Sequence, residues 1–312
     1  MIFIGMRGAG IRKRFGFAFW AGYVPFSLHK NGIGRITQLT SMNITKLRCG
    51  GDGTAPRRLF FFRILSIGAL GILLTLGIYQ CSFFNDRRNI QDYYYPLEQL
   101  KEGQVYCYDM TVNGQSVPDY WYYILLERDS GVFLSSTNYD RFFHINQMVT
   151  EKITSSGSVA KRYTVFEQDS LSGKAIGSSV RLTAPDLFPF SVKDSSGVFL
   201  FSMEYHPVSA PLTKLYLIRN RRYTGDGPDF VLNGQKHPTI RMSIREAIGN
   251  EQEGASEIEG RGEELYARGK GLVYFEKRYG KNGEVVRQYR LKEIITMEAL
   301  EKRAGQHLFD SN

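Results

Sequence analysis

From Gln104 onward, hydrophobic and polar positions alternate in short runs that are rich in Val, Ile, Tyr, Phe and Thr. This alternation and this composition are typical of β-strands that bury one face. The pattern predicts strands at residues 104–112, 120–128, 132–137, 142–149, 159–167, 175–183, 197–205, 215–223, 240–247, 272–279 and 285–295. A chain with so many short strands and so few helical runs belongs to the mainly β class.

Residues that tolerate left-handed backbone geometry separate several of these runs, and they predict hairpins and an antiparallel sheet. The predicted turns are Asn113–Gly114, Asp129–Ser130–Gly131, Asp226–Gly227 and Asn282–Gly283. The Asn-Gly-Gln sequence at Asn113 recurs at Asn233. The recurrence reflects either two related halves or common turn chemistry.

The register of the last hairpin follows from its apolar positions. A three-residue loop with Gly283 in the left-handed position sets three apolar pairs opposite one another: Tyr279 with Val285, Phe275 with Tyr289, and Val273 with Leu291. A two-residue loop would set Phe275 against Arg290 instead. Since a one-residue slip turns the apolar set to the other face, the three-residue loop is predicted.

The run from Tyr120 to Leu126 is apolar on both faces. Such a strand either lies in the middle of a layered core or has one face that lines a cavity. In the second case, the apolar pocket would be lined by Trp121, Tyr123 and Leu125.

The predicted fold is a curved antiparallel sheet, half-barrel or sandwich-like, preceded by one N-terminal hydrophobic helix. A short C-terminal helix should begin after a Thr296 cap and end at Gly305. The acidic, Gly-rich stretch 249–264 predicts a mobile surface loop. The expected divisions are a basic leader at 1–62, a signal or anchor helix at 63–81, a tether at 82–102, a β domain at 103–295, and a helix with a tail at 296–312.

An uncharged apolar segment runs from Ile64 to Tyr79, preceded by Arg57, Arg58 and Arg63. A basic flank before such a segment is typical of a signal or anchor sequence and stays on the cytoplasmic side. The segment therefore predicts membrane attachment through residues 64–79, with the β domain outside the cytoplasm, in the cell envelope.

Cys81 directly follows this segment and resembles the lipidated cysteine of bacterial envelope lipoproteins. In that family a small residue precedes the cysteine, whereas Gln80 stands here. Three outcomes stay open: lipid attachment at Cys81, an uncleaved N-terminal helix, or a cleaved product.

The net charge of +9 lies in the leader. Residues 1–82 hold 11 Lys or Arg and one acid, whereas the remainder holds 29 Lys or Arg and 30 acids. A nucleic-acid-binding domain needs basic residues on its own surface, so no nucleic-acid partner is expected. The leader is interpreted either as a cytoplasmic tail or as the product of an over-extended start, with the true start near Arg57; we favour the second.

The C-terminal stretch with Tyr266, Ala267, Gly269, Gly271, Leu272 and Val273 resembles the closing hairpin of uncharacterised envelope proteins of Gram-negative bacteria. Some of these proteins are similar to the half-barrel lipoprotein carriers. The resemblance covers about thirty residues and carries no catalytic residue. It implies a strongly curved antiparallel sheet with helices on its concave side, a shape that can hold acyl chains.

No catalytic, metal or cofactor site is predicted. The five histidines are scattered, and three cysteines without a CxxC motif do not form a zinc site. Asp140 with His144, and Ser158 with Lys161, are formal acid–base and Ser-x-x-Lys patterns, but a solvated loop and chance explain them better. Cys107 is expected as a small core residue of a strand.

The leading hypothesis is a membrane-anchored extracytoplasmic binding protein that is not an enzyme, whose ligand is a partner protein or a lipid. The alternatives are an envelope hydrolase with an unrecognised site and a structural envelope component. A cleft that joins Asp140 or His144 to a serine would favour the hydrolase. An exposed apolar patch on the final hairpin would favour the structural component.

Overall fold

The computed structural model describes residues 16–17, 24–25, 87–169, 172–193, 197–251, 257–280 and 282–310, with side chains described as far as residue 306. The predicted anchor 64–79 and Cys81 lie outside the described residues. Within the described residues, no helix has the length and apolar character needed to cross a membrane. The described residues from 87 onward belong to one compact unit. The short strands β1 (Gly16–Phe17) and β2 (Val24–Pro25) pair with each other.

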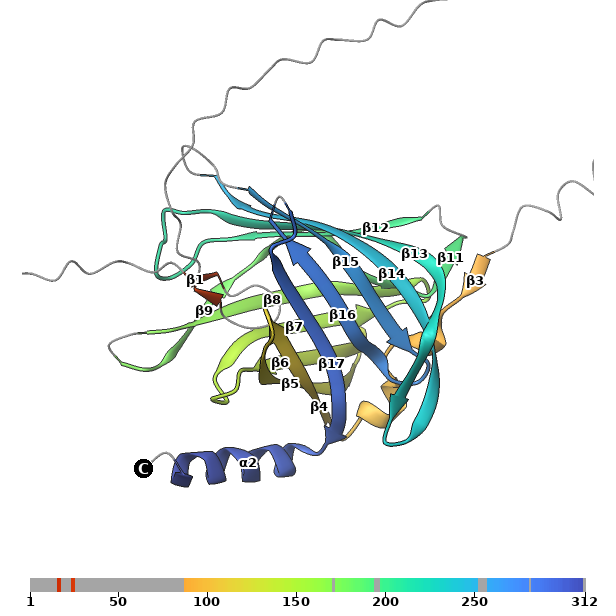
Figure 1. Cartoon of the computed structure of the whole chain (residues 1–312), viewed down its shortest axis with the longest axis horizontal. Helices are drawn as coiled ribbons and strands as arrows, with labels where there is room; N and C mark the ends of the chain where they lie inside the picture. Colours follow the sequence, from red (N-terminus) through yellow and green to blue (C-terminus); the bar gives the residue numbers. More distant parts are fainter. Residues whose placement is uncertain are drawn as a thin grey trace, which may run out of the picture. The chain divides into compact units, whose positions relative to one another are not determined.

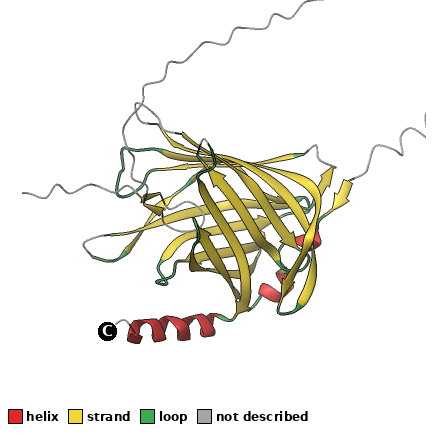
Figure 2. Cartoon of the chain, viewed as in Figure 1, coloured by secondary structure: helices red, strands yellow, loops and turns green. Residues whose placement is uncertain are grey.

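The predicted mainly β class is confirmed (Figures 1 and 2). The strands from β4 onward are β4 (Gln104–Val112), β5 (Gln115–Arg128), β6 (Gly131–Tyr139), β7 (Ile145–Ile153), β8 (Gly157–Gln168), β9 (Ala175–Ser179), β10 (Arg181–Pro189), β11 (Ser191–Lys193), β12 (Val198–Tyr205), β13 (Leu215–Leu232), β14 (Gln235–Asn250), β15 (Glu257–Ala267), β16 (Gly271–Tyr279) and β17 (Val285–Ile295). Every pairing in the described part of the chain is antiparallel.

The sheet closes on itself through β10. The first half of β10 pairs with β12, at Arg181 to Pro185, and its second half pairs with β8, at Asp186 to Pro189. The described strands β4–β8, β10 and β12–β17 therefore form a closed antiparallel barrel of twelve strands, with β9 added beside β8. The predicted half-barrel or sandwich is wrong, since the sheet is closed. Closure depends on the pairing of β10 with strands on both sides, which no local sequence pattern indicates.

Side chains that alternate along the strands fill the inside of the closed sheet. On β4, Tyr106, Tyr108 and Met110 belong to the large interior cluster, whereas Val105 and Cys107 belong to a smaller cluster with Leu300 of helix α2 (Met297–Asp310). Cys107 is thus a buried strand residue, as expected. The C-terminal helix is confirmed, and Thr296 Oγ1 accepts the backbone N–H of Ala299 at 3.2 Å. The helix continues to Asp310, so its predicted end at Gly305 is wrong.

The residues expected as a tether form part of the core instead, from Arg87 onward. Strand β3 (Arg87–Asn89) pairs with β11, and the 3₁₀ turns η2 (Gln91–Tyr93) and η3 (Leu97–Leu100) follow it. This segment is coloured orange in Figure 1. Its buried side chains pack in the interior cluster: Ile90, Tyr93, Tyr94, Tyr95 and Leu100. We call residues 90–100 the plug. It takes the place that the carrier resemblance assigns to helices on the concave side.

The last hairpin has the predicted register. Phe275 pairs with Tyr289 and Tyr279 with Val285, and Gly283 has a φ of 70°. The Asn113–Gly114 turn is also confirmed, with positive φ at both residues. Asn233–Gly234 adopts the same conformation and joins β13 to β14. The predicted turn at Asp226–Gly227 is wrong, because these residues lie within β13 beside a bulge.

Two other local predictions fail for physical reasons. The run 175–183 is two strands, since β9 pairs with β8 whereas β10 turns toward β12. The stretch 249–264, expected as a mobile loop, includes the end of β14 and most of β15. The inward positions of β15 are Gly260, Gly262, Glu264 and Tyr266, so the strand lacks the apolar alternation that would reveal it.

Candidate functional site

The interior of the closed sheet carries charged side chains as well as aromatic ones. Arg219 and Arg221 point inward from β13, Glu246 from β14, Glu264 from β15 and Lys277 from β16, and all five are almost fully buried. Buried charges are tolerated only where they are paired and hydrogen-bonded. The long-range register brings these five residues together, although they lie up to 58 positions apart in the sequence.

Glu246 is the centre of this network. Its carboxylate accepts hydrogen bonds from Arg219 Nε at 2.6 Å, Lys277 Nζ at 3.3 Å and the Tyr279 hydroxyl at 2.5 Å. Burial opposes ionisation of Glu246, but Arg219 and Lys277 hold its pKa well below the usual range. Glu264 accepts Arg221 Nε at 2.9 Å and the Tyr266 hydroxyl at 2.8 Å. Burial and the nearby Arg219 lower the pKa of Lys277 to about 8. Each charge of the network is paired with an opposite charge, which indicates a structural role.

Trp121, Tyr123 and Leu125 all face this interior, as the apolar-pocket prediction requires. The space beside Trp121 and Tyr123 is a cavity of about 40 Å³. The plug fills the rest: the Tyr95 hydroxyl lies 2.7 Å from that of Tyr123, and the Tyr94 hydroxyl donates to Glu151 at 2.6 Å. Pockets for small-molecule ligands usually measure about 300–1,000 Å³. In this conformation the interior holds the chain's own tyrosines.

The two formal catalytic patterns do not form a catalytic arrangement. Asp140 Oδ1 accepts the backbone N–H groups of Phe142 and His144, which makes it a turn-capping residue in an exposed loop. His144 Nδ1 lies 3.6 Å from the Asp140 carboxylate. Ser158 is buried and donates to Glu151, whereas Lys161 is exposed. Among the described residues, no three His, Cys, Asp or Glu side chains are grouped so that they could hold a metal ion.

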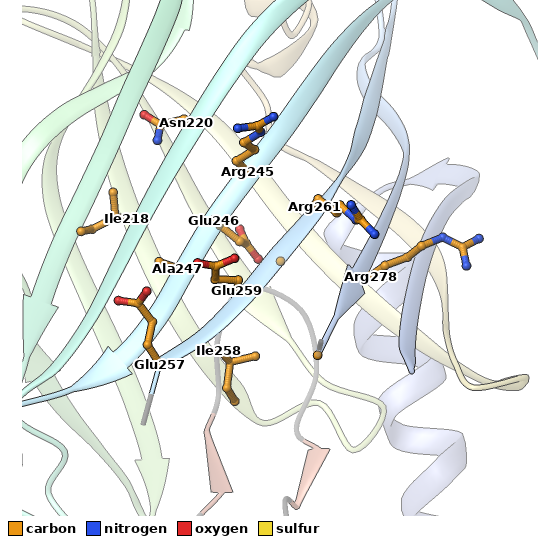
Figure 3. Close-up of a pocket in the computed structure, with 12 residues that line it drawn as sticks. Ile218, Asn220, Arg245, Glu246, Ala247, Glu257, Ile258, Glu259, Arg261 and Arg278 are labelled. Atoms are coloured by element: carbon orange, nitrogen blue, oxygen red, sulfur yellow. The ribbon is translucent and has the colours of Figure 1, made fainter. Parts of the chain in front are cut away.

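A larger cavity of about 750 Å³ lies over β13–β16 (Figure 3). It is lined mainly by outward side chains of adjacent strands, and we call it the outer groove. Its lining residues are Ile218, Asn220, Arg245, Glu246, Ala247, Glu257, Ile258, Glu259, Gly260, Arg261, Arg278 and Gly280. Sequence reasoning missed this site because β15 was taken for a loop.

The register places four nitrogen-bearing side chains of the outer groove in one row. Asn220 pairs with Arg245, Arg245 with Arg261, and Arg261 with Arg278. We call these four residues the arginine row. Figure 3 shows its three arginines side by side on neighbouring strands, with Glu257 toward the other end of the groove. Neighbouring strands are about 4.8 Å apart, so the row spans roughly 14 Å across the sheet.

Comparison with known proteins gives two similar solved structures. One is a presumed lipoprotein from Parabacteroides distasonis, with 13% identity and a TM-score of 0.43, covering 65% of this chain and 97% of that one. The other is a presumed exported protein with a YmcC-like fold from Bacteroides fragilis, with 11% identity and a TM-score of 0.44, covering 64% of this chain and 98% of that one. No protein-family model and no curated protein matches the chain.

Proposed function

We propose that this chain is an extracytoplasmic binding protein, tethered to a membrane through residues 64–79, and that it binds its ligand in the outer groove. The observation that carries the proposal is the contrast between the two spaces. The outer groove measures about 750 Å³ and is lined by polar and charged groups, whereas the interior space measures about 40 Å³.

The energetics of the plug favour the outer groove over the interior. Tyr93, Tyr94 and Tyr95 are each at least nine-tenths buried. An aromatic side chain buries about 200 Å², and each Å² contributes about 25 cal/mol. Exposing the three tyrosines would therefore cost on the order of 10 kcal/mol. A micromolar ligand has a net binding free energy of about 8 kcal/mol, so a lipid that displaced the plug would have to supply the cost of exposing the tyrosines in addition to this amount.

The two other classes receive less support. Neither Asp140 nor His144 forms a hydrogen bond with a serine in the described part of the chain, so the pattern that would favour a hydrolase is missing there. The large exposed hydrophobic side chains of the described residues lie outside the final hairpin 271–295, which was the expected mark of a structural component.

Native mass spectrometry of the full-length protein, purified from its own membranes, tests the proposal. Ala247 lines the outer groove, so Ala247→Trp should fill it, whereas Lys161→Trp adds the same ring at an exposed position of β8. A bound species should be present in the wild type and in Lys161→Trp and be lost in Ala247→Trp. A species retained in Ala247→Trp, or absent from all three proteins, would contradict the proposal.

The intact mass of the same preparation tests the tether. A diacyl-modified chain that begins at Cys81 would establish a lipoprotein. A chain that begins before Ile64 without added mass would establish a helical anchor. A chain that begins after Cys81 would refute membrane attachment through residues 64–79.

A further inference from the structure

The arginine row places like charges directly opposite one another. Arg261 lies between Arg245 on one side and Arg278 on the other. Directly opposed side chains have Cβ atoms about 5 Å apart, and like charges in this arrangement destabilise a sheet. The row therefore does not contribute to the stability of the fold in the way that the buried pairs do.

Nearby carboxylates neutralise this row only at its edge. Arg278 lies 2.7 Å from Glu276 on its own strand. Two carboxylates lie two positions from Arg261 on β15. Glu263 pairs with Arg241 at 3.4 Å, and within the described residues Glu259 forms no salt bridge. Within the described part of the chain, neither Arg245 nor Arg261 has a carboxylate within salt-bridge distance. Two adjacent guanidinium groups, flanked by the amide of Asn220, are thus presented to the outer groove.

From this geometry we infer that the arginine row is a binding site for phosphate groups of the ligand. Guanidinium groups donate parallel hydrogen bonds to phosphate oxygens, and a bound anion removes the repulsion between Arg245 and Arg261. The row runs across the strands, so it matches a ligand that presents two or more phosphates along a line. Glu259 lies two positions from Arg261 on the same face of β15 and borders the row, and Glu257 lies beyond it; both repel an anion and confine it to the row. This inference rests on the proposed function, and it specifies the chemical class of the ligand that the outer groove binds.

The chemistry is shared by two sources, a soluble phosphate ester and a lipid headgroup. Two assays distinguish them. Calorimetry measures binding of inorganic tripolyphosphate to the full-length protein in detergent. Flotation measures binding of the protein, freed of its own lipid, to phosphatidylcholine vesicles with and without phosphatidic acid. Binding of tripolyphosphate alone supports a soluble ligand. Binding of the phosphatidic acid vesicles supports a lipid headgroup, whether or not tripolyphosphate also binds.

Arg261→Gln removes the central guanidinium, and Arg162→Gln removes an exposed charge on β8. The first change should weaken binding of either probe at least tenfold, since a hydrogen bond to a charged group contributes more than the 1.4 kcal/mol that corresponds to a factor of ten. The second should leave binding within twofold. Unfolding midpoints of both variants should stay close to that of the wild type, because both positions are exposed.

Two results would overturn the inference: no binding of either probe to the wild type, or equal loss of binding in both variants. Its failure can be told from failure of the proposed function. A native ligand that is lost in Ala247→Trp but contains no phosphate leaves the outer groove as the binding site and removes only the assignment of the arginine row.

Discussion

The buried network gives a sharp prediction for Glu246→Gln. The glutamine keeps the shape of the side chain but removes the charge that pairs with Arg219 and Lys277, both at most 2% exposed in their side chains. Removing one partner of a buried pair costs about 3–5 kcal/mol. Because the glutamine oxygen can still accept one hydrogen bond, we expect the free energy of unfolding to fall by about 3 kcal/mol, at the low end of that range. This is a large part of the ~5–15 kcal/mol that stabilises a typical domain.

Guanidinium unfolding, followed by tryptophan fluorescence, measures this loss. The matched control is Glu263→Gln on the neighbouring strand, whose pair with Arg241 is about two-fifths exposed. Exposed pairs contribute about 0–1 kcal/mol, so the control should lose less than that. A second variant, Glu246→Gln with Lys277→Met, removes the unpaired ammonium and should recover part of the loss. A loss below about 1 kcal/mol for Glu246→Gln, or equal losses in both single variants, would refute the structural role of the network.

Three further outcomes are expected. Gly262→Ala should lower the free energy of unfolding by about 2–3 kcal/mol, because a Cβ there would lie 1.9 Å from the backbone oxygen of Glu276. The control Gly305→Ala places its Cβ in open space in helix α2 and should raise the free energy of unfolding by up to about 1 kcal/mol. Equal effects of the two variants in the unfolding assay would refute the close approach at Gly262. The Lys277 pKa is about 8 in the folded protein against 10.5 ordinarily, so the unfolded chain binds more protons above pH 8. Stability of the wild type should therefore rise relative to Lys277→Met between pH 8 and 9, by about 1 kcal/mol, and a flat difference would contradict the depressed pKa. Arg303→Ala should lose less than about 1 kcal/mol, since its pair with Glu293 is two-fifths exposed, and a larger thermal shift would show that α2 contributes more than this contact.

Local patterns were sufficient for two of the hairpins. The register of the β16–β17 hairpin follows from its own apolar positions and from Gly283, so Phe275 and Tyr289 could be paired before the fold was known. The Asn113–Gly114 turn likewise needs only two residues with positive φ. In such cases the information lies within about fifteen residues of sequence.

The missed features depend on partners that are distant in the sequence. In the sequence, Gly262 and Glu264 of β15 are typical of a solvated loop. In the fold, Glu264 pairs with Arg221 and Gly262 lies against the backbone of Glu276. The plug was interpreted as a tether because the acceptor of its Tyr94 hydroxyl, Glu151, lies 57 residues away. The arginine row exists only in the register of the four strands β13–β16, and no spacing of Arg245, Arg261 and Arg278 along the chain indicates it.

The apolar pocket predicted from Trp121, Tyr123 and Leu125 shows the limit of a pattern. The alternation correctly places these residues on one face and inside the sheet. It does not tell whether that face meets a ligand or another part of the same chain. Here the space is occupied by Tyr94 and Tyr95, and the site that we propose for a ligand is a surface that carries charged side chains.

Hydrogen–deuterium exchange of the full-length protein with and without tripolyphosphate tests most directly whether ligand is held outside the closed sheet. A ligand that links the arginine row should slow local opening, so amides of β14, β15 and β16 around Arg245, Arg261 and Arg278 should exchange more slowly. Amides of the plug and of β5 around Trp121 should be unchanged. Slower exchange at the plug and Trp121, with none around Arg261, would place the ligand in the interior and contradict the proposed site.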